Sequence, residues 1–270
     1  MEKPIGVFDS GVGGLTVARE IMRQLPNERL IYFGDTARVP YGSKSPSTVL
    51  RFSRQIVHFL QTKEVKGIVV ACNTASALAL PELQKEIDIP IIGVIEAGAK
   101  AACDVTVTKH IGVIGTEGTV KSRIYTRYLT ELSPSITVVE KACPLFVPLV
   151  EEGLVEDRVT DDIANRYLGE LKDYEIDTLI LGCTHYPLIR NTVARIMGDK
   201  VKLVNPAYET TKRLKALLDE KGLLNKEYHQ VPKHEYYVSD AVERFIAFAD
   251  EVLPCTVSEE NVKSVDIESY

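Results

Sequence analysis

The chain has 270 residues, of which 45% are hydrophobic and 26% are charged, a composition typical of globular proteins and unlike that of disordered or collagen-like chains. The 38 acidic and 32 basic residues give a net charge of -6, which argues against a basic surface for nucleic acid or anionic lipid and favours a small-molecule partner. No apolar stretch reaches the ~18–20 residues of a membrane-spanning helix, and Met1–Pro4 leads directly into a strand-like run. We therefore expect a cytoplasmic protein that does not contact membranes.

Short apolar runs rich in β-branched residues alternate along the chain with stretches of helical character. One such stretch begins with an N-cap serine and a first-turn proline at Ser45–Pro46, and it carries an apolar stripe at helical spacing as far as Leu60. Strands that alternate with helices predict an α/β fold in which the strands are buried and mainly parallel. The predicted strands cover residues 5–8, 29–33, 67–71, 91–95, 111–114, 136–139, 178–181 and 201–204.

Three segments of the first half recur in the second half, in the same order and at similar spacing. Ile111 lies 106 positions after Ile5, and Cys183 lies 111 positions after Cys72. Because chance seldom preserves the order and spacing of three segments, we infer two similar α/β lobes, related by a pseudo-twofold axis, with an active site in the cleft between them. The matched pairs are 4–14 with 110–119, 67–75 with 178–186, and 89–94 with 201–205.

The C-terminal part of the chain has no counterpart in this repeat. Its pattern predicts a helix over 210–224, a turn over 225–232 and a strand over 235–239. Asp240 and Glu243 have the spacing of a capping box and predict the start of a second helix. The residues do not indicate on which lobe this tail packs.

Five cysteines are spread along the chain without a C-x-x-C pair, so the sequence predicts neither a disulfide framework nor a metal site. Cys72 and Cys183 each follow a predicted buried strand, at the end where α/β proteins bind ligands. Each is followed by hydroxyl or amide side chains at a predicted helix start, where backbone N–H groups favour a thiolate. The remaining cysteines lack this setting and are expected to be inert thiols: Cys103, Cys143 and Cys255.

The two selected thiols would face each other across the cleft, one from each lobe. Such a pair suits racemisation, in which a thiolate removes a proton from one face of a carbon and a thiol returns a proton to the other face. His185, two residues after Cys183, is placed to support that thiol. Asp9, at the end of the first strand, holds the corresponding place near Cys72, although an ordinary turn before Gly11 would also explain it.

The glycines of segment 9–14 invite comparison with a dinucleotide-binding loop. Thr16 stands where that motif requires its third glycine, and the sequence lacks a G-x-x-x-x-G-K-[ST] phosphate loop. The strand-end turns instead carry many hydroxyl and amide groups, which together suit the binding of a small acidic substrate. The residues expected to line this site are Ser10, Asn73, Thr74, Thr116, Thr119 and Thr184.

Four motifs stand at these turns: DSGVGG at 9–14, DTARVPYG at 35–42, ACNTAS at 71–76 and GCTHYPL at 182–188. Together they make the whole chain resemble the bacterial glutamate racemases, within the wider aspartate/glutamate/hydantoin racemase superfamily. The paired cysteine motifs alone point to the superfamily, whereas the aspartate–serine–glycine opening and the histidine after the second cysteine point to glutamate. The resemblance implies a cofactor-independent, two-base interconversion of L- and D-glutamate that supplies D-glutamate to peptidoglycan synthesis.

The resemblance also implies roles for individual residues. Cys72 would act on D-glutamate and Cys183 on L-glutamate, with Asp9 and His185 as their respective supports. Glu151 matches a further acidic residue of the site. The substrate-binding motifs of the family match Ser10, Tyr41, Gly42, Asn73, Thr74 and Thr184.

At the level of the whole chain, the resemblance implies that the C-terminal tail returns to the first lobe. Residues 1–96 plus 208–270 would then form a discontinuous first lobe that carries Cys72, and residues 97–207 would form a second lobe that carries Cys183. The resemblance also implies a homodimer.

Other functions compete with this interpretation. A sister enzyme of the same superfamily would racemise aspartate or another small acid. A two-lobed amino-acid binding protein would have the same fold with inert cysteines, although the expected lack of a signal peptide disfavours it. A redox protein joining Cys72 to Cys183 would lack the usual C-x-x-C motif.

Overall fold

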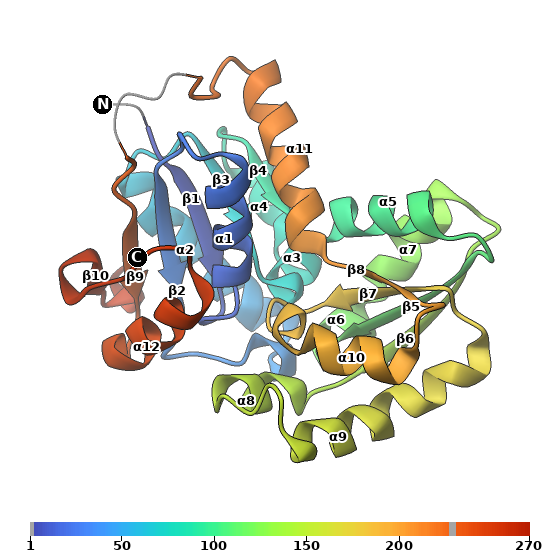
Figure 1. Cartoon of the computed structure of the whole chain (residues 1–270). Coiled ribbons are helices and arrows are strands. Elements are labelled where there is room, and N and C mark those ends of the chain that lie inside the picture. Colours follow the sequence, from blue (N-terminus) through green and yellow to red (C-terminus); the bar gives the residue numbers. More distant parts are fainter. Residues whose placement is uncertain (1–2, 227–230) are drawn as a thin grey trace.

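Two parallel β-sheets flanked by helices form the framework of the protein (Figure 1), whose computed structural model describes residues 3–226 and 231–270. The first sheet contains β1 (Ile5–Asp9), β2 (Leu30–Gly34), β3 (Gly67–Val70), β4 (Ile91–Gly93), β9 (Glu235–Val238) and β10 (Val262–Ser264). The second sheet contains β5 (His110–Gly115), β6 (Thr137–Ala142), β7 (Thr178–Gly182) and β8 (Lys202–Val204). The predicted α/β fold with parallel strands is confirmed. We call each sheet with the helices packed on it a lobe.

The two sheets repeat the same strand order. The first sheet runs β10-β9-β2-β1-β3-β4 and the second runs β6-β5-β7-β8. Each strand of the second sheet therefore has an equivalent in the first, with β5 matching β1 and β7 matching β3. All neighbouring strands are parallel, so the carboxyl ends of the strands in each sheet lie at one edge.

Twelve helices cover the sheets in the part of the chain that the structure describes. Residues of α1, α5, α7, α11 and α12 share one continuous apolar core with strands of both sheets. Separate cores lie under α2, α3 and α4 in the first lobe and under α8, α9 and α10 in the second. The helices are α1 (Leu15–Gln24), α2 (Pro46–Thr62), α3 (Asn73–Leu78), α4 (Leu80–Glu86), α5 (Ile95–Val105), α6 (Glu117–Ser122), α7 (Ile124–Leu132), α8 (Phe146–Glu151), α9 (Arg158–Gly169), α10 (Arg190–Met197), α11 (Pro206–Glu220) and α12 (Val242–Val252).

Helix α2 begins where the sequence predicts. The Ser45 side chain accepts a hydrogen bond from the backbone N–H of Thr48, and Pro46 occupies the first turn. The apolar stripe is buried against the first sheet, with Val49 and Ile56 fully covered. In the described residues, no helix combines the length and apolar content needed to cross a membrane.

Helix α11 differs from its prediction at both ends. It begins at Pro206, because the side chain of Asn205 caps it by accepting from the N–H of Ala207 at 3.1 Å. It ends at Glu220, because Gly222 adopts a φ of 66° that turns the chain away. The predicted turn that follows includes residues 227–230, which lie outside the described residues.

The predicted capping box of the last helix is wrong. Helix α12 begins at Val242, and its N-cap is Ala241 in the left-handed region with no side-chain cap. Asp240 does not cap the helix. Its backbone N–H donates to the hydroxyl of Thr36, and its carboxylate accepts from the N–H of Ala241. A contact with the loop after β2 thus decides where this helix starts.

The tail strands join the first sheet. β9 pairs with β2, and β10 pairs with β9 at the edge of the sheet. The sequence predicted β9 but not β10, which has only three residues and exposes two of them. The boundaries of the two lobes at residues 96/97 and 207/208 stay a prediction.

Candidate active site

A small cavity lies between the lobes, at the carboxyl ends of β1 and β3 on one side and of β5 and β7 on the other. Cys72 follows β3 and Cys183 follows β7, so the two thiols come from equivalent places in the two sheets. The cavity measures about 20 Å³. Its lining consists of Ser10, Val39, Pro40, Tyr41, Gly42, Cys72, Asn73, Thr74, Thr116, Val147, Cys183, Thr184 and His185.

Cys72 is the N-cap residue of α3. Its sulfur accepts a hydrogen bond from the N–H of Ala75 at 3.4 Å, and its thiol donates to the Ser10 hydroxyl at 3.6 Å. Burial raises the pKa of Cys72 to about 12, with a further contribution from the negative charge of Asp9. Cys72 is therefore a neutral thiol that can give up a proton. The expectation that the helix start favours a thiolate here is wrong, because burial outweighs the hydrogen bond from the N–H of Ala75.

Cys183 lies beside an imidazole and a carboxylate that form a chain. The Cys183 sulfur lies 3.8 Å from Nδ1 of His185, and Nε2 of the same ring lies 3.0 Å from Oε1 of Glu151. Burial alone would lower the pKa of His185, but the hydrogen bonds to Cys183 and Glu151 and the nearby negative charges raise it to about 10. A protonated His185 thus supplies positive charge and a proton donor next to the sulfur.

Asp9 ends β1 and is fully buried between the lobes. One carboxylate oxygen accepts from the N–H of Gly11 at 3.1 Å, and the other accepts from the Thr184 hydroxyl at 3.4 Å. Burial raises the pKa of Asp9, and the charge of His185 opposes this effect. The structure therefore places the side chain of Asp9 against a residue of the second lobe, and Asp9 influences Cys72 through its charge.

Polar side chains from the two lobes meet around the cavity. The hydroxyls of Thr74 and Thr116 lie 2.8 Å apart, and the Tyr125 hydroxyl donates to Oδ1 of Asn73 at 2.7 Å. The Thr119 hydroxyl lies 3.4 Å from that of Thr74. Thr119 is fully buried and does not line the cavity, so it orients the two other threonines. A cavity of this size holds about one water molecule, so the lobes must separate to admit an amino acid.

Tyr41 and Gly42 belong to a loop, residues 39–42, that lines the cavity on the side of the first lobe. The Tyr41 hydroxyl donates to the buried carboxylate of Asp35, which also binds the guanidinium of Arg38 at 2.8 Å. This bond turns the tyrosine hydroxyl toward the first lobe. A methyl group at Gly42 would lie 2.6 Å from Cβ of Thr116, so only glycine permits this closeness of the lobes.

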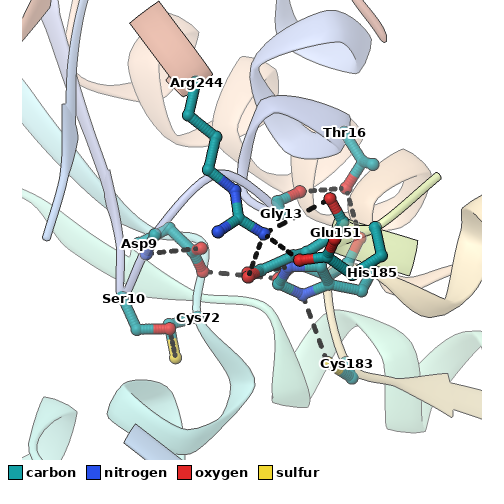
Figure 2. A network of polar contacts seen from close by, with 12 residues as sticks. Asp9, Ser10, Gly13, Thr16, Cys72, Glu151, Cys183, His185 and Arg244 are labelled. Carbon is teal, nitrogen blue, oxygen red and sulfur yellow. Dashed lines mark hydrogen bonds and ion pairs between the residues drawn. The ribbon is translucent and has the colours of Figure 1, made fainter. Parts of the chain in front are cut away.

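Gly13 permits a second close approach. A Cβ atom there would lie 2.4 Å from Nδ1 of His185 and 2.6 Å from the hydroxyl oxygen of Thr184. Thr16, which follows this turn, donates to the backbone oxygen of Thr184 at 3.0 Å (Figure 2). Gly13 thus permits close contact between the lobes.

The structure brings all the predicted site residues to this region, and it adds others. Glu151 lies behind His185 and does not line the cavity. Val39, Pro40 and Val147 line the cavity although no sequence pattern selected them. Val39 and Pro40 lie inside the DTARVPYG motif at 35–42, which could have indicated them. Tyr125 and Arg244 approach the site from distant parts of the chain and had no local signal.

Comparison with known proteins gives one consistent picture. The Asp/Glu/hydantoin racemase family model matches residues 5–214. The glutamate racemase of Geobacter metallireducens is 50% identical over 251 residues, which cover 93% of each chain. The structure of glutamate racemase isoform RacE1 from Bacillus anthracis has a TM-score of 0.93 at 43% identity, covering 98% of this chain and 97% of that one. The structure of the Francisella tularensis glutamate racemase, in complex with D-glutamate, has a TM-score of 0.92 at 40% identity, covering 100% and 99%.

Proposed function

The chain belongs to the glutamate racemases of the Asp/Glu/hydantoin racemase family, and we propose that Cys72 and Cys183 are the two bases with which it interconverts L- and D-glutamate. The observation that carries this proposal is the presence of both thiols in one cavity, at equivalent strand ends of two repeated lobes. Two groups on opposite faces of one carbon are what stereochemical inversion by proton transfer requires. In this family the product serves peptidoglycan synthesis.

The two directions of the reaction use the thiols in opposite protonation states. With L-glutamate, the thiolate of Cys183 takes the α-proton, and the thiol of Cys72 gives its proton to the other face. With D-glutamate, Cys72 takes the proton and Cys183 gives one. The raised pKa of Cys72 supports its role as proton donor in the first direction. His185, held by Glu151, lies 3.8 Å from the Cys183 sulfur and is the group placed to exchange a proton with it.

The α-proton of an amino acid is weakly acidic, so the site must stabilise the negative charge that forms on the α-carboxylate. We assign this task to the polar groups that flank the thiols, Asn73, Thr74 and Thr184. The bond from Tyr125 to Oδ1 of Asn73 orients the amide NH₂ group for a ligand. Closure of the lobes would exclude water and strengthen these interactions.

Ser10, Tyr41 and Gly42 are proposed to bind the substrate from the first lobe, and Thr116 from the second. Because the Tyr41 hydroxyl is engaged by Asp35, the backbone of this loop is the part that would contact glutamate. Thr119 and Glu151 are proposed to act indirectly, by holding Thr116 and His185 in place.

We also propose a discontinuous first lobe of residues 1–96 plus 208–270 and a second lobe of residues 97–207, supported by the pairing of the tail strands with β2. The resemblance supports a homodimer, which light scattering would test. All five cysteines are free thiols, which supports a reducing, cytoplasmic setting.

The direct test is incubation of the purified protein with L-glutamate in D₂O, without added cofactor. Racemisation through proton exchange would abolish both the optical activity and the α-proton NMR signal. Aspartate serves as the parallel substrate. Exchange of aspartate but not glutamate would overturn the substrate assignment, and exchange of neither would favour an amino-acid binding protein.

A further inference from the structure

Arg244 reaches from the first lobe to the second beside the active site (Figure 2). It belongs to α12, which is anchored by its neighbour Phe245. The Phe245 ring is fully buried and packs against the rings of Tyr32 and Tyr236, with centroids 5.8 and 5.9 Å away. The base of the arginine is therefore fixed to the first sheet, whereas its guanidinium lies at the second lobe.

The guanidinium contacts three oxygen atoms at the C-terminal end of α8. Nη2 of Arg244 lies 2.9 Å from Oε1 of Glu152, 3.8 Å from Oε2 of Glu151 and 3.4 Å from the backbone oxygen of Glu151. The other carboxylate oxygen of Glu151, Oε1, contacts His185. The Glu151 carboxylate thus contacts both groups, with Oε1 bonded to the imidazole and Oε2 facing the guanidinium.

The charges around these groups agree with that geometry. Burial would raise the pKa of Glu151, but the hydrogen bond and charge of His185, together with the charge of Arg244, lower it. His185 is faced by Cys183, Glu151 and Asp9. An ionised Glu151 in a fixed position can hold the imidazole ring at Cys183.

We propose that Arg244 is a positioning residue that binds the end of α8 when the lobes close and thereby holds Glu151 against His185. The inference rests on the proposed roles of Cys183 and His185. Because α12 moves with the first lobe and α8 with the second, opening the cleft breaks the contacts of Arg244 with α8. The supporting chain of Cys183 is therefore complete only when the lobes are closed, which couples closure to catalysis.

The test uses Arg244→Gln, with Arg54→Gln as its matched control. Arg54 is also half-exposed and pairs with a glutamate, Glu86, at 2.6 Å, but it lies on α2. L- and D-glutamate have equal free energies, so kcat/KM must fall equally for both enantiomers. We expect kcat/KM to fall on the order of tenfold in Arg244→Gln, which is within the ~10²-fold that a small misplacement in an active site can cost. We expect kcat/KM of Arg54→Gln to be unchanged. Arg244→Lys should keep most of the activity, because one nitrogen makes all three contacts.

Isotope effects separate this role from a general structural one. If the support of Cys183 is weakened, its proton transfer becomes more rate-limiting and that of Cys72 becomes less so. The α-deuterium isotope effect on kcat/KM should therefore rise with L-glutamate and fall with D-glutamate. The double variant Arg244→Gln/Glu151→Gln should lose no more activity than Glu151→Gln alone, because Arg244 acts through that carboxylate.

Activity of Arg244→Gln equal to that of Arg54→Gln would overturn the proposal. So would losses that multiply in the double variant, isotope effects that do not change, or a lysine variant as impaired as the glutamine variant. If the isotope effects move in the opposite sense in both Arg244→Gln and Glu151→Gln, the coupling through Arg244 stands, and the assignment of the two thiols to the two enantiomers is reversed.

Discussion

At the scale of single residues, the two lobes are alike at the strand ends but differ in the groups that surround the two cysteine sulfur atoms. Cys72 contacts a serine hydroxyl and a backbone N–H, whereas Cys183 faces an imidazole that a carboxylate holds. The strand ends are equivalent, but their partners are chemically different. Each thiol must nevertheless serve as acid in one direction and as base in the other. The two halves of the reaction therefore depend on different supporting residues.

Cys72→Ser and Cys183→Ser should each lower racemisation in both directions by roughly 10³-fold, because both proton transfers are needed and a serine hydroxyl is a poor base. Each variant should still eliminate a β-leaving group from one enantiomer of a glutamate analogue, since elimination needs one base. Cys72→Ser should act on the L-analogue and Cys183→Ser on the D-analogue, as measured by release of the leaving group.

Cys103→Ser is the matched control, because Cys103 lies on α5 outside the cavity. It should racemise like the unmodified protein. Normal racemisation by either active-site variant would end the two-thiol mechanism.

Sequence alone could predict the site residues that follow a strand. Asp9, Cys72 and Cys183 each stand where an apolar run ends, and parallel strands bring such ends together. Arg244 could not be predicted in this way. It meets Glu151 because its long side chain reaches from α12 to the end of α8, and neither residue interrupts a pattern in its own segment.

At the scale of elements, strands and helices with strong local signals form as predicted, and exceptions arise where a distant contact intervenes. The buried strands and the capped start of α2 depend on residues close in sequence. The start of α12 depends on Thr36, which holds Asp240 and leaves Ala241 as the N-cap. A capping box is a local signal, so it could not reveal this competition.

The loop with Tyr41 and Gly42 offers a test at this scale. Gly42→Ala should hinder closure, because the added methyl would lie 2.6 Å from Cβ of Thr116 in the other lobe. We expect kcat/KM to fall on the order of tenfold through misalignment of the site. The free energy of unfolding should change by no more than ~1 kcal/mol, since the open form relieves the clash. Steady-state kinetics and denaturant unfolding measure these two effects.

Gly169→Ala provides the control for that variant. Gly169 ends α9, and a methyl group there would have no neighbour within 4 Å. Alanine should leave activity unchanged and stabilise the protein by up to ~1 kcal/mol through its helix propensity. Equal activity of the two alanine variants would show that contact between Gly42 and Thr116 is not needed for turnover.

At the scale of the whole molecule, the two lobes form a closed state whose cavity is too small for its substrate. The continuous core that joins the sheets contains residues of α1, α5, α7, α11 and α12, whereas the contacts between the lobes around the cavity are mainly polar. Polar contacts can exchange with water and a ligand at lower cost than a packed apolar core can be opened. Opening is therefore expected on the side of the cavity, with the shared core as the hinge.

Thiol labelling should detect this opening. Cys72 and Cys183 are 5% and 6% exposed, Cys255 is exposed, and Cys143 is fully buried outside the cavity. In the closed state Cys72 is both covered and protonated, so iodoacetamide should reach it only when the lobes separate. We expect Cys255 to label first, the two active-site cysteines next, and Cys143 last, as resolved by peptide mass spectrometry.

D-glutamate should slow labelling of Cys72 and Cys183 several-fold and leave that of Cys255 unchanged, because a ligand that bridges the lobes shifts the population toward the closed form. Cys255 serves as an internal control for reagent and pH. If the active-site cysteines label as slowly as Cys143 in the absence of ligand, the lobes do not open on the time scale of the labelling reaction. If D-glutamate leaves their rates unchanged, it does not bind between the two thiols, and closure around the substrate is refuted together with the placement of the site.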